Sequence, residues 1–239
     1  MSFIRDGYKK FKIFDQKQVN ELRKKFIEVF NLVSINNNYK KIKADKDIID
    51  LYHNKKKLWV AAYDQLRMLP DIYLLLNNTL KKKIHLKTGV KFPSLAAKPI
   101  VRVVMPGNIG TSKAAAHIDY PTYLGSKNAV TIWIPLQKID NEIGPLKLVP
   151  GSHKRKIKNL SKIINGIIVD QKNLDEKLFK SIKVNVGEAL IFSHHLVHKS
   201  TDNYSKKIRF SIDVRLNDLR LISYAKKLYY LNEKISFKK

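Results

Sequence analysis

Three residues of this chain have the types and the spacing of a metal site. His117 and Asp119 stand two positions apart in the segment HID, and His198 follows 79 positions after Asp119. In an extended backbone, side chains at i and i+2 project from one face, so an imidazole and a carboxylate can bind one ion together. Two neutral imidazoles and one carboxylate on one face of an octahedral ion leave the opposite face open, which suits non-haem Fe(II) and oxygen chemistry.

The blocks that follow this pair carry a resemblance to a known family. They read NAVTIWIPL, GPLKLVPGSHKR, VGEALIFSHHLVHKS and NYSKKIRFSIDVR. With an HxD pair, a GPL-to-PGSH segment and a distal histidine followed eleven residues later by an arginine, the chain resembles the phytanoyl-CoA dioxygenase branch of the Fe(II)/2-oxoglutarate-dependent oxygenases. The resemblance is strong over about residues 100–215, and the opening segment IRDGYKKFKIFDQKQVNELRKKF is similar to the family's entry helix. No departure touches the motifs.

The resemblance implies that His117, Asp119 and His198 hold iron. Of the histidines in the run SHHLVH, only His198 has the following serine and the downstream arginine in the family's spacing. That arginine, Arg209, is implied to bind the distal carboxylate of 2-oxoglutarate, and a guanidinium suits this role because it binds a carboxylate bidentately and does not titrate away. Alternation in KIRFSIDVR puts Ser211 on the same face as Arg209, so Ser211 is expected to donate a second hydrogen bond.

Five further residues have both a functional and an ordinary interpretation. Trp133 matches an aromatic that lines the cosubstrate pocket in the family, although a tryptophan in a strand usually packs in a core. Ser200, two positions after the distal histidine, and Arg102 are also expected at the cosubstrate. His194 and Arg215 are expected at the substrate. The ordinary alternatives are a partly exposed rim residue for His194 and a solvated charge at a strand end for Arg215.

Composition favours one cytoplasmic domain. At 239 residues with 44% hydrophobic content, the chain can bury one sizeable core. It has no cysteine, which excludes disulfides and thiol catalysis and is compatible with a reducing cytoplasm. No apolar stretch has the length of a signal peptide or of a membrane span. We therefore expect a cytoplasmic protein with no membrane span, and the sequence leaves its oligomeric state open.

The net charge is strongly positive, with 47 basic and 20 acidic residues giving +27. The lysines are dispersed along the chain, and abundant Lys, Ile and Asn are typical of an AT-rich genome. The other interpretations are an anionic substrate, an acidic carrier or a membrane surface. A small-molecule substrate, anionic if the charge is functional, is the expected partner, and nucleic acid is not.

The order of elements predicts an α+β, mainly β protein. A helix is expected over residues 15–34, with Asp15 as N-cap and Gln18 completing a capping box. Two more helical regions are expected at about 48–69 and 71–88, the second ending at Gly89. Strands dominate from about residue 99 to residue 215, and helices before strands fit α+β.

The resemblance implies a double-stranded β-helix, jelly-roll or cupin-like, with N-terminal helices packed on one sheet. The chain is accordingly divided into a helical part at about 1–95, a β core at about 96–216 and a C-terminal helical tail at about 217–239 of one dioxygenase domain. The polar stretch between PGSH and Ser181 is expected to be either a flap over the site or a plain surface insertion.

The cofactors implied by the resemblance are Fe(II), 2-oxoglutarate as cosubstrate and O2, with ascorbate supportive in vitro. The implied reaction is hydroxylation of an unactivated C–H bond of a small, anionic or carrier-bound metabolite, with release of succinate and CO2. One alternative is an oxygenase with the same ligands that needs no 2-oxoglutarate, against which Arg209 speaks. Another is a non-catalytic basic protein on the same β-barrel that binds nucleic acid or anionic lipid, against which the intact triad speaks. The sequence does not identify the substrate.

Overall fold

The computed structural model describes residues 2–75, 77–110, 114–120, 126–155, 160–163, 166–169, 175–221, 229–230 and 233–234. Helices come first along the chain: α1 (Phe3–Asp6), α2 (Gln16–Asn36), α3 (Asp45–Asn54), α4 (Lys56–Leu66), α5 (Pro70–Leu74) and α6 (Asn78–Thr88). None of them, among the ranges given, has both the length and the apolar composition needed to cross a membrane.

The N-terminal end of α2 is confirmed. The Asp15 carboxylate accepts from the backbone N–H of Gln18, and the Gln18 side chain accepts from the backbone N–H of Asp15, which completes the capping box. The region expected as one helix at 48–69 is instead two, α3 and α4, which meet at Lys55. Asn54 precedes this break, and asparagine disfavours helix interiors because its side chain competes for backbone hydrogen bonds.

The second long helix is also divided. Asn77 interrupts the region expected at 71–88, since its side chain accepts from the backbone N–H of Leu80 and so begins α6 as a new helix. The end of α6 is as predicted, because Gly89 takes the left-handed conformation with φ 78°. Hydrophobic periodicity therefore located the helical segments but not the breaks inside them.

A six-stranded antiparallel sheet, the major sheet, lies against these helices. Its strands are β1 (Tyr8–Lys12), β2 (Pro93–Leu95), β3 (Ile100–Val104), β5 (Val130–Pro135), β10 (Glu188–Ser193) and β12 (Arg209–Asp218). The order is β1-β10-β5-β12-β2, and β3 also pairs with β12. β1 comes from the opening segment that is similar to the family's entry helix, so that segment contains a strand at Tyr8–Lys12 before the helix α2 begins at Gln16. Only Tyr8 and Phe11 of β1 are buried, and its lysines hide the alternation.

A second antiparallel sheet, the minor sheet, faces the first. Its strands are β4 (His117–Ile118), β6 (Leu146–Leu148), β7 (Leu160–Ile163), β8 (Gly166–Val169), β9 (Lys180–Ile182) and β11 (His198–Lys199), in the order β7-β8-β4-β11-β6-β9. β7 and β8 belong to the polar stretch expected as a flap or insertion, and β8 extends the sheet beside β4. Residues 156–159, 164–165 and 170–174 of that stretch lie outside the described residues.

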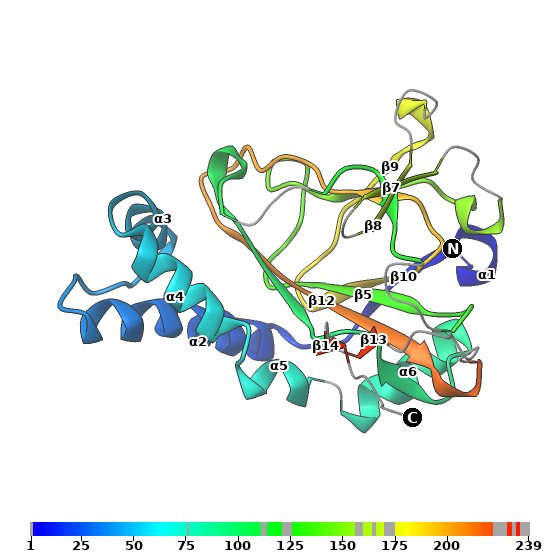
Figure 1. Cartoon of the computed structure of the whole chain (residues 1–239), viewed down its shortest axis with the longest axis horizontal. Helices are drawn as coiled ribbons and strands as arrows, with labels where there is room; N and C mark the ends of the chain where they lie inside the picture. Colours follow the sequence, from blue (N-terminus) through cyan, green and yellow to red (C-terminus); the bar gives the residue numbers. More distant parts are fainter. Residues whose placement is uncertain are drawn as a thin grey trace.

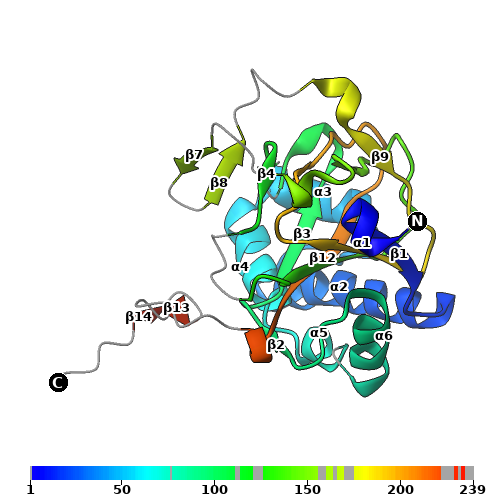
Figure 2. The same ribbon diagram turned by 90° about the vertical axis from the view of Figure 1, so that its right-hand side faces the viewer.

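Three layers result, and they confirm the predicted double-stranded β-helix with helices on one sheet. Both views place α2, α5 and α6 on one side of the molecule and β7, β8 and β9 on the other (Figure 1, Figure 2). One apolar core joins helix residues such as Phe26 and Phe30 to the major sheet. A second core fills the space between the sheets and includes Trp133, Leu148 and Phe192.

β12 is buried on both of its faces. All ten of its residues are buried. Phe210, Ile212, Val214 and Leu216 belong to the helix-side core. The alternate residues therefore face the space between the sheets, since successive side chains of a strand point to opposite faces.

The expected C-terminal helical tail is wrong in the described residues. β12 continues to Asp218, Leu219–Leu221 form one 3-10 turn, and β13 (Tyr229–Tyr230) pairs with β14 (Glu233–Lys234). Paired tyrosines favour a strand over a helix. The other residues of the tail lie outside the described ranges.

Phe210 makes the helix-to-sheet packing testable. Its ring packs edge-on against Phe26 at a centroid distance of 5.7 Å. We expect Phe210→Ala to lower the free energy of unfolding by about 3–5 kcal/mol, because a large side chain is removed from a closed core. Phe92→Ala is the matched control, since Phe92 is 60% exposed, and should change it by less than about 0.5 kcal/mol. Urea denaturation measures both, and equal losses would contradict the assigned core.

Candidate metal and cosubstrate site

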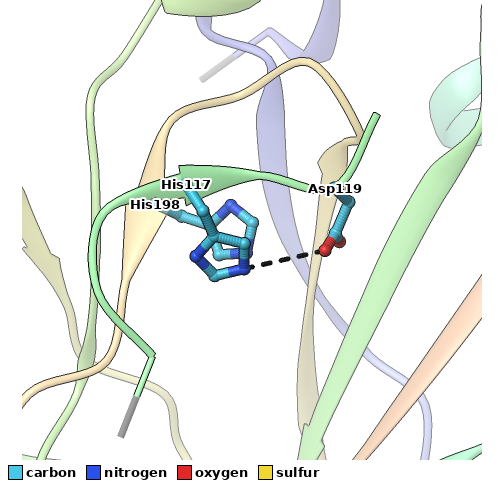
Figure 3. Close-up of side chains that lie close together, drawn as sticks. All are labelled: His117, Asp119 and His198. Carbon is cyan, nitrogen blue, oxygen red and sulfur yellow. Dashed lines mark ion pairs between the residues drawn. The ribbon is translucent and has the colours of Figure 1, made fainter. Parts of the chain in front are cut away.

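Strand pairing brings the three predicted metal ligands together. His117 on β4 stands directly opposite His198 on β11, and cross-strand partners have Cβ atoms only about 4.5–5.5 Å apart. Asp119 follows β4 immediately, on the same side as His117. Ligand atoms of the three residues all lie within 4.8 Å of one another. Figure 3 shows the two imidazoles side by side with the Asp119 carboxylate turned toward them.

Backbone carbonyls fix the tautomer of both imidazoles. Nδ1 of His117 lies 2.7 Å from the carbonyl oxygen of Ala115, and Nδ1 of His198 lies 2.9 Å from that of Leu196. A carbonyl only accepts, so each Nδ1 carries the proton and donates it. Each Nε2 is thereby left with a lone pair, which is the state a metal ligand needs.

Asp119 is buried among compensating groups. The Thr131 hydroxyl donates to its Oδ2, and Nη2 of Arg215 lies 3.5 Å from its Oδ1. Oδ1 also lies 3.7 Å from Nε2 of His117. Burial by itself raises the pKa of Asp119, but the Arg215 guanidinium is the largest influence in the opposite direction, and the pKa lies well below its usual range. The carboxyl is therefore ionised.

His198 is the more deeply held of the two imidazoles. The ring of Phe192 lies 4.6 Å from its ring, and the Ser152 hydroxyl accepts from the backbone N–H of the neighbouring Val197. Burial, followed by the proximity of His117, lowers the pKa of His198 to about 3, so the ring stays neutral near pH 7. His117 keeps 22% of its side chain exposed whereas Asp119 keeps 2%, so the site opens to solvent on the His117 side.

His194 is not a partly exposed rim residue, which was the ordinary alternative for it. β10 ends at Ser193 and the chain then turns at His194 and His195, so His194 does not continue the strand. His194 is fully buried, and its backbone is held between Ala129 and Tyr120. Burial lowers its pKa to about 4, with the Asp119 charge acting in the opposite direction. His194 is therefore a buried ring that is neutral near pH 7.

The inner face of β12 provides the predicted cosubstrate residues. Arg209 and Ser211 are both buried there, as alternation predicted. Nη1 of Arg209 donates to the carbonyl of Gly144. Within the described part of the chain, Nε of Arg209 and the hydroxyl of Ser211 are buried without a hydrogen-bond partner. Burial lowers the pKa of Arg209 to about 10, so it remains a cation near pH 7.

The remaining predicted cosubstrate contacts are Arg102, Trp133 and Ser200, and each of them has different surroundings. Arg102 stands opposite Ser211 across β3 and β12, and its Nε lies 3.0 Å from Oδ2 of Asp213, so it is paired with an acid. Trp133 is buried in the core between the sheets, on the face that its cross-strand partner Asp213 shares. Ser200 lines a groove of about 590 Å³ together with residues such as Lys147 and Lys199.

Arg215 is not a solvated strand end. β12 continues past it to Asp218, and Arg215 is buried beside Asp119. This position places its guanidinium against the Asp119 carboxylate.

Sequence reasoning missed three residues that shape the site. Thr131 and Asp213 each stand two positions from a residue that was singled out, Trp133 and Ser211, and alternation would have placed them on the same inner face. Gly144 was quoted only as part of the GPL motif. It has a φ of 85°, and its carbonyl accepts a hydrogen bond from Arg209.

Gly144 allows a test of this packing. A Cβ built there would lie 2.8 Å from Nη1 of Arg209 and 2.7 Å from the carbonyl oxygen of Asp202, whereas one built on Gly89 meets nothing within 4 Å. Both glycines have a left-handed φ, so Gly89→Ala should cost only about 1–2 kcal/mol of unfolding free energy from the backbone. We expect Gly144→Ala to cost about 1–3 kcal/mol more because of the added contacts. Urea denaturation compares the two variants, and equal losses would refute the close approach of Arg209.

Comparison with known proteins gives relatives with hydroxylase and dioxygenase names. Methylphosphonate hydroxylase of Gimesia maris is 31% identical over 140 residues, which cover 56% of this chain and 52% of that protein. Phytanoyl-CoA dioxygenase of Arabidopsis thaliana is 29% identical over 139 residues, which cover 53% and 49%. The chain thus spans about half the length of the curated relatives it matches.

Solved structures share the fold. The α-ketoglutarate-dependent carbocyclase SnoK from nogalamycin biosynthesis matches with a TM-score of 0.61 at 18% identity, over 90% of this chain and 81% of that chain. EctD from S. alaskensis with 2-oxoglutarate and 5-hydroxyectoine matches with a TM-score of 0.61 at 16% identity, over 98% and 79%. A sequence model of the family described as Phytanoyl-CoA dioxygenase (PhyH) matches residues 6–211, and the chain therefore belongs to this family.

Proposed function

We propose that this protein is an Fe(II)- and 2-oxoglutarate-dependent dioxygenase that hydroxylates an unactivated C–H bond. The observation that carries the proposal is the convergence of two imidazoles with free Nε2 atoms and one ionised carboxylate within 4.8 Å. Two imidazoles and one carboxylate that leave the other positions open are typical of non-haem Fe(II) oxygenases, whereas magnesium sites use oxygen ligands alone. His117, Asp119 and His198 would hold the iron.

Arg209 and Ser211 fit the far end of 2-oxoglutarate. The buried Nε of Arg209 and the buried hydroxyl of Ser211 are donors that have no acceptor among the described residues. Buried donors of this kind are costly unless a ligand satisfies them. The two neighbouring arginines, Arg102 and Arg215, each face an acid, whereas no described acidic side chain forms an ion pair with Arg209. A bound carboxylate would therefore complete its surroundings.

The residues of this chain would then divide the work. Bound iron and 2-oxoglutarate would use O2 as the oxidant, so that one atom of O2 enters a substrate C–H bond, the other enters succinate, and CO2 is released. The triad holds the metal from one side and leaves the other side open. Arg209 and Ser211 orient the cosubstrate, and the core around Trp133 and Phe192 excludes water from one wall of the site.

The substrate is proposed to be small and anionic, or bound to an acidic carrier. Support comes from the net charge of +27 and from the relative named for methylphosphonate, which is itself a small anion. The non-catalytic basic binding protein is not favoured, because a scaffold that had lost catalysis would have no need to keep three metal ligands and Arg209 aligned. A cytoplasmic location with ascorbate as a supporting reductant in vitro completes the proposal.

Succinate release tests the reaction class. Purified protein with Fe(II), ascorbate and 2-oxoglutarate should release succinate in an O2-dependent manner, and small phosphonates and acyl thioesters are the substrates to add first. His117→Ala should abolish the release because it removes a metal ligand. His153→Ala is the matched control, since its Nε2 faces the carbonyl of Ile4 and not the triad. A wild-type protein that releases no more succinate than His117→Ala under any of these conditions refutes the proposal.

Arg209 separates cosubstrate binding from metal binding. We expect Arg209→Ala to raise the 2-oxoglutarate concentration for half-maximal succinate release about 10- to 100-fold, the effect of losing charge-assisted hydrogen bonds to a carboxylate. Mn(II) affinity should stay within about twofold of wild type because Arg209 is not a metal ligand. Arg220→Ala is the control, since Arg220 pairs with Asp218 outside the site. Parallel loss of both affinities would contradict the separate roles.

A further inference from the structure

We propose that Thr131 and Arg215 form a two-point clamp that fixes the Asp119 carboxylate in its metal-binding orientation. This inference rests on the proposed function, because it concerns the carboxylate that would bind the metal. Neither residue is assigned a contact with the metal itself, so both are positioning residues.

The clamp is built from neighbouring strands of the major sheet. Thr131 on β5 and Arg215 on β12 stand directly opposite each other, so their side chains project from the same face. The Thr131 hydroxyl donates to Oδ2 of Asp119, and Nη2 of Arg215 lies 3.5 Å from Oδ1. Asp119 follows β4 of the minor sheet. The two sheets are therefore joined at this carboxylate.

Each oxygen of Asp119 is thereby given a different environment. Oδ1 lies 3.7 Å from Nε2 of His117 and faces the place where the ligand atoms converge. Oδ2 is engaged by the Thr131 hydroxyl. The clamp would leave one carboxylate oxygen of Asp119 for the metal. A carboxylate that bound the metal through both of its oxygens would fill a further coordination position. Positions for a bidentate cosubstrate and for O2 are kept open in this way.

Burial strengthens the pairing of Asp119 with Arg215, and this pairing has two opposing effects on metal binding. The side chains of Arg215 and Asp119 are 5% and 2% exposed, so solvent does not screen the pair as it does at a surface. The guanidinium restrains the carboxylate, which favours metal binding. It also repels an incoming divalent cation. The sign of the effect of replacing Arg215 therefore distinguishes a clamp from a merely repulsive neighbour.

Mn(II) affinity, measured by titration calorimetry without cosubstrate, tests the clamp. Thr131→Val keeps the shape of the side chain and removes the hydroxyl, and we expect it to weaken Mn(II) binding about 10-fold or more, as loss of a group that orients a metal ligand does. Thr131→Ser keeps the hydroxyl and should bind nearly as wild type does. Arg215→Met should weaken binding, and Arg215→Lys should restore part of it.

Arg23→Met is the matched control for the arginine variants, because it removes an Arg–Asp pair of 2.6 Å to Asp45 that lies outside the site. Circular dichroism and thermal unfolding establish that each variant is folded, and the nearly isosteric Thr131 pair gives the result even if the Arg215 variants unfold. Wild-type affinity in Thr131→Val, or tighter binding in Arg215→Met, overturns the clamp while the proposed function stands. A wild-type protein that binds no Mn(II) overturns both.

Discussion

The pairing of His117 with His198 across two very short strands is the contact on which the site depends. β4 and β11 each have two residues, too few to be stable by themselves. Their neighbours hold them, because β8 flanks β4 and β6 flanks β11 within the minor sheet. The imidazoles are thus placed by a sheet whose other strands carry no ligand. The carbonyls of Ala115 and Leu196 then set the proton on each ring, so the ligand lone pairs are prepared by the backbone.

Several charged side chains lie around this contact. Buried ions are costly unless they are paired, and here Arg102 faces Asp213 while Arg215 faces Asp119. Arg209 has only the carbonyl of Gly144 as an identified partner in the described residues. Among the described residues of this region, Arg209 is therefore the arginine without an acidic partner, which fits the anionic cosubstrate proposed above.

The sequence predicted those features that depend on a few neighbouring residues, and those that belong to a family motif with fixed long-range spacing. The capping box at Asp15, the left-handed Gly89 and the shared face of Arg209 and Ser211 follow from patterns a few residues long. The three candidate metal ligands followed from the resemblance, because the family's residue types in the family's order imply a fold that brings them together. Thr131 was missed for the opposite reason. Nothing in TIWIPL reveals that its threonine will stand opposite Arg215, since strand pairing is decided by residues about eighty positions away.

The helix errors have a similar origin. Periodicity continues through Asn54 and Lys55 and through Asn77, so it gives the apolar face of each segment but not the turns that let successive helices pack back on one another. β1 was hidden because lysines at an edge strand replace the alternation that an inner strand shows.

β12 has one more consequence. Its hydrocarbon side chains face the helices and its ionic ones face the other sheet, so a slip of one residue during folding would exchange the two sets completely. Guanidinium and carboxylate groups would then be driven into the aliphatic layer, while Phe210 and Ile212 would take their places. Burying unpaired charges in the aliphatic layer is costly, so the alternation along β12 disfavours a misaligned pairing of the strand that carries Arg209.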